Sequence, residues 1–253
     1  MPERTARKLV ALGKIKIGWT VCRIRERVAV DRCHRCQGYG YHATQCLGPD
    51  NSNACRKSDL LTQTAAAQRA EILIVSEPSS AGKQGSWLVD RRGDAAIAAT
   101  NNLPGTLTLE ARGEGFVWAR TSGLTIFSCY FSPNVASGDF EAQLDSLEAS
   151  IRTTRGRIIV AGDFNAKSPS WGSSKLDARG QAVAELLARL HLLPINVGAE
   201  PTWYRESTGS RSVIDIMTGK PEVVTEVQGW RVLEDETLSD HRYLFMSWVP
   251  EKR

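Results

Sequence analysis

The stretch Ile158–Ser174, with the sequence IIVAGDFNAKSPSWGSS, decides how the chain folds. Its first four residues are apolar, a pattern typical of a strand that is covered on both faces. Gly162 then permits a sharp change in backbone direction. Asp163 and Asn165 follow two residues apart, so in an extended chain their side chains point to the same side. The pattern favours either a polar turn or a loop that orients a water molecule and contacts a phosphate oxygen.

The bulk composition indicates a soluble globular protein. The 253 residues suffice for one large domain with an appendage. No stretch approaches the ~18 consecutive apolar residues of a membrane span, and the N-terminus lacks the apolar core of a secretion signal. We therefore expect an intracellular protein without a membrane partner, in which the cysteines are reduced unless they bind a metal. The oligomeric state does not follow from the sequence.

Charge and cysteines divide the chain into two parts. Residues 1–58 carry a net charge of +8 and residues 59–253 a net charge of −4, which together give the overall +4. Five of the six cysteines also lie in the first part. We therefore predict a basic arm over 1–58 and one folded domain over 59–253. Such an arm suits DNA or RNA as a polyanionic partner, although the charge alone is equally consistent with solubility.

The basic arm contains a candidate zinc site. Cys33, Cys36, His42 and Cys46 lie within 14 residues, a ligand set that suits a tetrahedral Zn²⁺ ion. This segment resembles the CCHC zinc knuckle of the first-frame protein of arthropod non-LTR retrotransposons. The spacing departs from that family, because the position of the family histidine holds Tyr41 and His42 follows one residue later. Zinc binding and a degenerate knuckle without zinc both remain open.

The second part alternates between strand and helix patterns. Short apolar or alternating runs predict strands, and two segments with apolar residues at helical spacing predict amphipathic helices. The expected strands are 72–75, 95–99, 106–109, 116–119, 124–131, 158–161 and 243–248, and the expected helices are 59–71, 138–154 and 178–190. The run of neighbouring strands favours a large sheet over repeated βαβ units.

Four further residues are candidates for chemistry. Glu77 follows a buried strand directly, where a carboxylate is costly unless it binds a cation or a polar partner. Tyr130 ends another strand and offers a hydroxyl donor. His241 lies between a polar turn and a buried strand, and Asp215, inside a second apolar run, is a better placed partner for its ring than the adjacent Asp240. For each of them an ordinary structural role is the competing interpretation.

Five short motifs occur in order: Ser76-Glu77-Pro78, Tyr130-x-x-Pro133-Asn134, Gly162-Asp163-x-Asn165, Ser212-x-x-Asp215 and Ser239-Asp240-His241. Together they resemble the endonuclease/exonuclease/phosphatase superfamily, with the greatest similarity to the apurinic-like endonuclease domain of non-LTR retrotransposons. The resemblance implies an α/β (α+β) fold, a four-layered sandwich of two mixed sheets flanked by helices. It also implies hydrolysis of a DNA phosphodiester, target-site nicking and action in the nucleus.

The same resemblance implies roles for individual residues. Glu77 resembles the ligand of Mg²⁺ (or Mn²⁺), assisted by Asp240. Asp163 resembles the residue that activates the attacking water, Asn165 the phosphate ligand and Tyr130 its helper. His241, held by Asp215, resembles the histidine that contacts the phosphate. Asn134 is a candidate for contact with the substrate, and Trp171, just past the central loop, either packs under that loop or contacts the substrate.

One departure from the family concerns the start of the domain. Family members begin with a central strand that ends in an essential Asn, but the chain before Asp59 still resembles knuckle sequence. We therefore expect a domain that lacks its first strand. Two alternatives to an active endonuclease follow: a catalytically impaired relic that binds nucleic acid, and a superfamily hydrolase that acts on lipid or inositol phosphates.

Overall fold

The computed structural model describes residues 14–17, 20–23, 54–78, 87–205 and 207–250, which belong to two compact units, Met1–Ser52 and Asn53–Arg253. In the first unit, β1 (Lys14–Ile17) pairs antiparallel with β2 (Thr20–Arg23). The alternation of apolar residues over 14–21 predicts one continuous strand, and this prediction is wrong because β1 and β2 are two strands that pair with each other. The four proposed zinc ligands lie outside the described residues.

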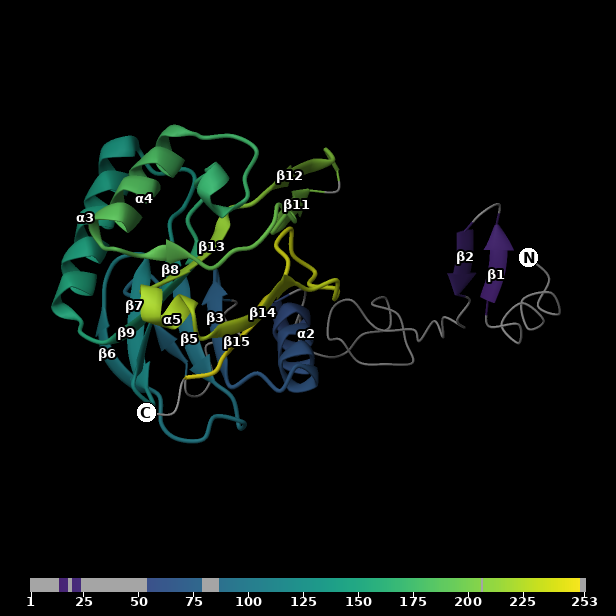
Figure 1. The fold of residues 1–253 in the computed structure, drawn as a ribbon, viewed down its shortest axis with the longest axis horizontal. Coiled ribbons are helices and arrows are strands. Elements are labelled where there is room, and N and C mark those ends of the chain that lie inside the picture. Colours follow the sequence, from purple (N-terminus) through teal and green to yellow (C-terminus); the bar gives the residue numbers. More distant parts are fainter. Residues whose placement is uncertain (1–13, 18–19, 24–53, 79–86, 206, 251–253) are drawn as a thin grey trace, which may run out of the picture. The chain divides into compact units, whose positions relative to one another are not determined.

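The second unit is built on a six-stranded sheet in the order β10-β13-β9-β8-β7-β6 (Figure 1). Its central strands β8 and β9 are parallel, and the other neighbours are antiparallel. The bounds are β6 (Thr108–Arg112), β7 (Phe116–Thr121), β8 (Leu124–Tyr130), β9 (Arg157–Asp163), β10 (Leu193–Pro194) and β13 (Asp215–Gly219). The apolar run 158–161 is therefore part of β9, a central strand of this sheet.

A second layer of strands faces one side of this sheet. It consists of a three-stranded sheet in the order β3-β5-β4 and of the antiparallel pair β14-β15. The bounds are β3 (Ile72–Ser76), β4 (Leu88–Val89), β5 (Ala95–Ala99), β14 (Val227–Val232) and β15 (Leu244–Trp248). Apolar side chains of both layers form one continuous core, including Ile97 of β5, Ile126 of β8 and the partly buried Ile74 and Met246. Among the described strands, β3 pairs only with β5 and β15 only with β14.

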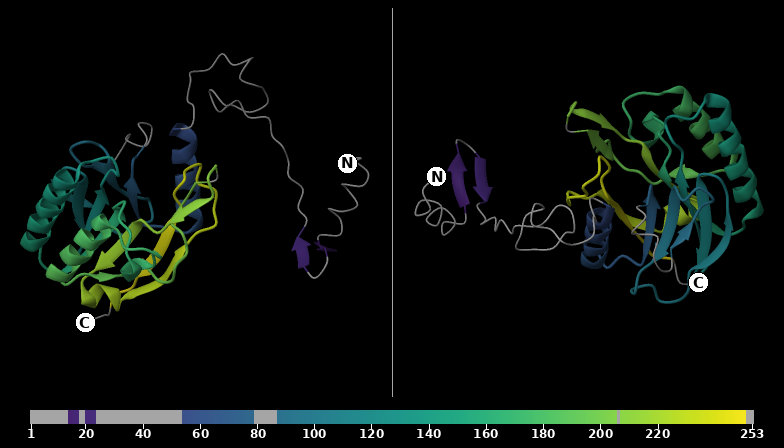
Figure 2. Two further views of the ribbon diagram at one scale, coloured as in Figure 1. Left: turned by 90° about the horizontal axis from the view of Figure 1, so that it is seen from above. Right: turned by 180° about the vertical axis from the view of Figure 1, so that it is seen from behind.

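Helices cover the other face of the six-stranded sheet. Helices α3 (Ser137–Thr153) and α4 (Ala178–Arg189) lie side by side there (Figures 1 and 2). Their buried residues pack with Phe127, Cys129 and Phe131, whereas Ile126 points to the opposite core, as the alternation of a strand requires. The short elements η3 (Pro169–Trp171) and α5 (Pro221–Val224) complete this unit together with the hairpin of β11 (Trp203–Arg205) and β12 (Ser210–Ser212).

Helix α2 (Ala54–Ala67) lies beside β14 and β15. The helix was predicted over 59–71, so it begins five residues earlier and ends four residues earlier than predicted. Arg69, just after its end, has a positive φ of 53°, which ends the helical path. The predicted sandwich of two sheets and flanking helices is confirmed. No helix among the described residues is long and apolar enough to cross a membrane.

Candidate active site

Five strands place their ends at one edge of the sandwich. Strands β3, β8 and β9 finish there with Ser76, Tyr130 and Asp163, while β13 starts there with Asp215. His241 precedes the start of β15 at the same edge and forms an isolated bridge with Trp203. Because strands from both layers meet here, polar side chains far apart in the sequence are brought together.

The two aspartates are direct cross-strand neighbours. Asp163 and Asp215 are opposite each other in the antiparallel pairing of β9 with β13. Like charges in this arrangement repel each other and destabilise the sheet. Asp163 is 2 % exposed, so water screens its charge poorly. The arrangement therefore requires a positive charge or a proton nearby.

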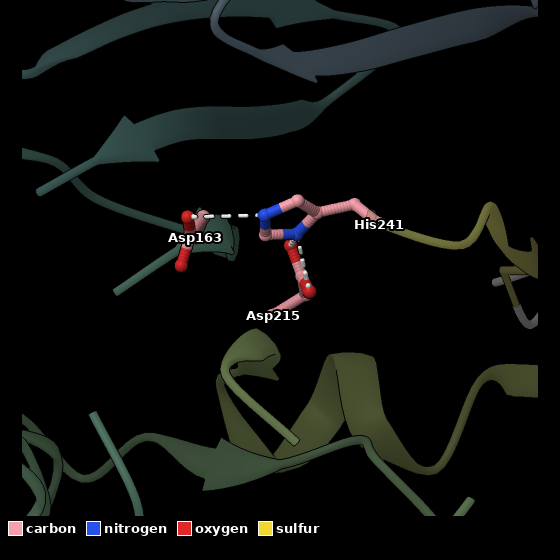
Figure 3. A group of neighbouring side chains, drawn as sticks. All are labelled: Asp163, Asp215 and His241. Carbon is pink, nitrogen blue, oxygen red and sulfur yellow. Dashed lines mark hydrogen bonds and ion pairs between the residues drawn. The ribbon is translucent and has the colours of Figure 1, made fainter. Parts of the chain in front are cut away.

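The imidazole ring of His241 lies between these carboxylates (Figure 3). Its Nδ1 is 3.1 and 3.0 Å from the two carboxylate oxygens of Asp215, and its Nε2 is 3.8 Å from Oδ2 of Asp163. The bond from Nδ1–H to Asp215 fixes the ring, so that Nε2 points to Asp163. The three residues also form a group whose ligand atoms lie within 4.8 Å of one another, close enough for a shared metal ion.

This geometry shifts the pKa of both partners. Burial, followed by the charge of Asp215, raises the pKa of Asp163 to about 7, although His241 opposes the shift. For His241, burial lowers the pKa, but the hydrogen bond and charge of Asp215 together with the charge of Asp163 outweigh it and raise the pKa to about 9. At neutral pH the imidazole is therefore a cation, and Asp163 is able to accept a proton.

The loop after β9 is held tightly around Asp163. Oδ1 of Asp163 accepts the backbone N–H of Asn165 at 2.9 Å, and Oδ2 accepts the Asn165 amide at 2.8 Å. Ser76 of the other sheet accepts the Asp163 N–H at 3.2 Å and donates to the carbonyl of Cys129. Asn165 has a φ of 47°, a conformation that is uncommon outside glycine and that persists only when the surroundings impose it. The carboxylate is therefore pre-oriented.

Gly162 is required for this approach of β9 to β8. Its φ is 148°, and a Cβ atom added to it would lie 1.9 Å from the carbonyl oxygen of Cys129. Any other residue would push the two central strands apart directly before Asp163. The glycine that the sequence indicated as a point of turning thus serves close packing of two backbones.

Glu77 and Tyr130 form a second polar pair at the same edge. The Tyr130 hydroxyl donates to Oε1 of Glu77 at 2.6 Å. Burial and then this hydrogen bond raise the pKa of Tyr130, so the phenol stays protonated and continues to donate. Glu77 is exposed, has a φ of 50° and contributes negative charge to the surroundings of Asp163 and His241. Its carboxylate is available to a cation from solvent.

Three predicted residues are placed outside this cluster. The carboxylate of Asp240 pairs with Arg205 at 3.2 Å instead of joining the group around Asp163. Asn134 is exposed on the loop after β8. Trp171 is 1 % exposed and its Nε1–H donates to the carbonyl of Ala166, so the prediction of a substrate contact for it is wrong. An indole of this size fills the core beneath the loop because η3 turns it inward.

The β11–β12 hairpin brings cations that were not singled out in the sequence. Arg205 lies over the Trp203 ring at 5.1 Å and Arg211 over the Tyr204 ring at 5.3 Å. Both arginines are exposed, and the Tyr204 N–H donates to the Asp240 carbonyl next to His241. The sequence signal was the run Trp203-Tyr204-Arg205 before a Ser/Thr/Gly turn and Arg211 after it. The hairpin forms a basic and aromatic rim beside the cluster.

Comparison with known proteins agrees with this arrangement. The sequence model of a family described as endonuclease-reverse transcriptase matches residues 124–245, a segment that contains Asp163, Asp215 and His241. The structure is similar to the endonuclease domain of TRAS1, a telomere-specific non-LTR retrotransposon, with 27 % identity and a TM-score of 0.62. That alignment covers 79 % of this chain and 94 % of the TRAS1 domain.

The chain is thus similar in sequence and fold to proteins of the endonuclease/exonuclease/phosphatase superfamily.

Other solved structures share the fold at lower sequence identity. An AP endonuclease from Archaeoglobus fulgidus aligns with a TM-score of 0.58 and 14 % identity, over 78 % of this chain and 96 % of that protein. The AP endonuclease LMAP from Leishmania major aligns with a TM-score of 0.56 and 14 % identity, over 78 % and 84 %. No curated protein matches the sequence. The similar structures thus include endonucleases and a 3′ phosphatase from Neisseria.

Proposed function

We propose that this chain is a divalent-metal-dependent endonuclease that nicks DNA by hydrolysing a phosphodiester bond. The observation that carries the proposal is the position of the His241 ring between Asp163 and Asp215 at the open edge of the sandwich. Similarity to the TRAS1 endonuclease domain favours DNA and target-site nicking over other phosphate esters.

Asp163 is assigned the role of general base. Its buried carboxylate has a pKa near neutrality, the range in which a base is partly free and still accepts a proton well. Hydrogen bonds from Asn165 hold the carboxylate in one orientation. A water molecule beside the Asp163 carboxylate would be aligned and deprotonated there as it attacks phosphorus.

His241 is assigned the stabilisation of charge on the phosphate. Its pKa of about 9 keeps the ring protonated at neutral pH, and Asp215 fixes its orientation. A fixed cation at this position favours the transition state, in which negative charge grows on the phosphoryl oxygens and the leaving oxygen. The Asn165 amide is assigned as a further phosphate contact, after exchange of its present partners.

The residues present fit a hard divalent cation such as Mg²⁺ or Mn²⁺. Exposed Glu77, oriented by Tyr130, provides an oxygen ligand, and the crowded carboxylates of Asp163 and Asp215 add excess negative charge nearby. When bound, such an ion would act as a Lewis acid on the phosphate. Asp240 remains a weaker candidate ligand, because it would first have to leave Arg205.

The β11–β12 hairpin supports nucleic acid as the substrate. Exposed arginines attract the phosphate backbone, and the neighbouring aromatic rings offer surfaces for bases or sugars. The basic arm is a second candidate contact with DNA or RNA. Zinc binding by Cys33, Cys36, His42 and Cys46 is a separate proposal, which metal analysis of the purified chain beside a Cys36→Ser variant tests.

The experiment is conversion of supercoiled plasmid to nicked circles in Mg²⁺, with and without EDTA. We expect nicking by the wild type, and loss with EDTA, Asp163→Ala or His241→Ala. The matched controls Asp145→Ala and His191→Ala change exposed residues outside the cluster and should retain activity. A folded wild type that binds DNA in a salt-dependent manner without nicking it would instead identify the catalytically impaired relic. Turnover of a lipid or inositol phosphate would favour the remaining alternative.

A further inference from the structure

Arg179 lies in the first turn of α4, below the two loops that carry the candidate catalytic residues. The helix starts with Asp177, whose side chain accepts the Gly180 N–H at 2.7 Å. Asp177 also accepts the Lys167 N–H, so the helix start is tied to the loop that follows Asn165. These bonds hold the start of the helix in place, and the half-buried side chain of Arg179 extends from it.

One end of the Arg179 guanidinium joins two loops. Its Nη2 donates to the carbonyl of Phe131 at 3.1 Å and to the carbonyl of Phe164 at 3.2 Å. Phe131 directly follows Tyr130, and Phe164 stands between Asp163 and Asn165. A single donor group thus links the loop after β8 to the loop after β9.

The surroundings make this cation unusual. The guanidinium carbon lies 3.7 Å from the centroid of the Phe140 ring, and Nε is buried without a hydrogen-bond partner among the described residues. Burial lowers the pKa of Arg179, while the charges of Asp163 and Asp177 oppose that shift. A partly desolvated cation with an unsatisfied N–H is costly in a protein interior. The two hydrogen bonds to the loop carbonyls and the contact with Phe140 offset this cost.

The bridge acts on atoms that orient the site. The Phe131 carbonyl also accepts the Asn165 amide at 3.3 Å, and the Phe131 N–H donates to the Asp163 carbonyl at 2.9 Å. Movement of the Phe131 backbone would therefore displace Tyr130, Asp163 and Asn165 together. An arginine suits this task because its planar group holds donors in fixed directions, whereas a lysine ammonium is a flexible point charge.

We propose that Arg179 is a positioning residue that locks the Tyr130 loop against the Asp163–Asn165 loop and so sets the catalytic geometry. This inference rests on the proposed endonuclease function. It differs from it in that Arg179 itself touches neither water nor phosphate. Errors of about 1 Å in such geometry cost roughly 100-fold in rate, so the loss should appear in kcat.

The test compares Arg179→Met and Arg179→Lys with Arg189→Met. Methionine keeps the apolar contact with Phe140 but cannot donate, and Arg189 is an exposed arginine of the same helix, paired with Glu148 at 2.8 Å. Initial nicking rates at varied plasmid concentration give kcat and KM. We expect kcat to fall about 10- to 100-fold in Arg179→Met with KM changed less than about threefold, a smaller loss in Arg179→Lys, and no loss in Arg189→Met.

A second readout does not depend on activity. Amide hydrogen exchange of Phe131 and Asn165 should be about tenfold faster in Arg179→Met, or in Arg179→Lys if the methionine variant does not fold, with protection in β7 unchanged. Unchanged exchange at both amides would overturn the inference. If the wild type nicks DNA, an unchanged kcat in Arg179→Met, or a change confined to KM, would also overturn the inference. A wild type without nicking would refute the proposed function, while the exchange measurement would still decide the role of Arg179.

Discussion

The strongest quantitative prediction concerns Asp215→Asn. Asp215 is the main cause of the raised pKa of His241, because it provides both a hydrogen bond and a negative charge. Asparagine keeps the size of the side chain and removes the charge. The pKa of His241 should then fall from about 9 toward its ordinary value of about 6.5, because burial is opposed only by the charges of Asp163 and Glu77.

The expected loss of activity follows from the protonated fraction of the ring. At pH 7.5 a group with a pKa of about 9 is about 97 % protonated, and a group with a pKa of about 6.5 is about 9 % protonated. If the reaction requires the imidazolium, the nicking rate at this pH should fall about tenfold. In a plot of nicking rate against pH, the acidic limb should also move below about pH 7, because Asp163 is no longer repelled by the charge of Asp215.

The assay is the initial nicking rate in Mg²⁺ from pH 6 to pH 9.5. The wild type should give a bell-shaped profile that rises as Asp163 loses its proton and falls as His241 loses its proton. The matched control is Asp240→Asn, which removes the neighbouring exposed carboxylate and should leave the alkaline limb in place. An alkaline limb that stays near pH 9 in Asp215→Asn would refute the reasoning, since the cation would then not be His241.

Three other predictions test separate parts of the site. Gly162→Ala should destabilise the fold by roughly 2–4 kcal/mol in chemical unfolding, because its Cβ meets the Cys129 carbonyl, whereas Gly138→Ala, with open space around it, should change stability little. Tyr130→Phe removes the donor to Glu77 and should raise several-fold the Mg²⁺ concentration for half-maximal nicking; an unchanged requirement would separate Glu77 from the metal. Arg211→Ala should weaken DNA binding and reduce the salt slope of log K by about 0.9 if it contacts a phosphate, and an unaltered slope would exclude that contact.

Much of the fold could be predicted because local signals were strong. The apolar run 158–161 and the helical spacing of Phe140, Leu144, Leu147 and Ile151 gave elements that the structure confirms within a few residues. The predicted ends of an element were wrong where the sequence pattern that marks an end was weak. Helix α2 was placed too late because alanines on either side of Asp59 favour helix without marking its start.

The sequence by itself determined which residue types stand next to strand ends: Glu77, Tyr130, Asp163 and His241. It did so because buried strands followed by polar residues are visible in one dimension. Asp215 was predicted inside an apolar run, whereas it begins β13 in the structure. Only the tertiary structure decided their partners. The repulsion between Asp163 and Asp215 depends on the register of two antiparallel strands, and the position of the His241 ring between them depends on two sheets meeting at one edge.

The same reason explains the residues that sequence reasoning misplaced or missed. For Trp171 the sequence left open packing under the loop and contact with the substrate, because nothing in its neighbours records that η3 turns it into the core. Arg179 was not singled out, because the carbonyls that it bridges lie 48 and 15 residues away along the chain. Backbone carbonyls are identical in every residue, so no sequence pattern can mark them as partners. Their role arises only when packing brings two loops within reach of one guanidinium.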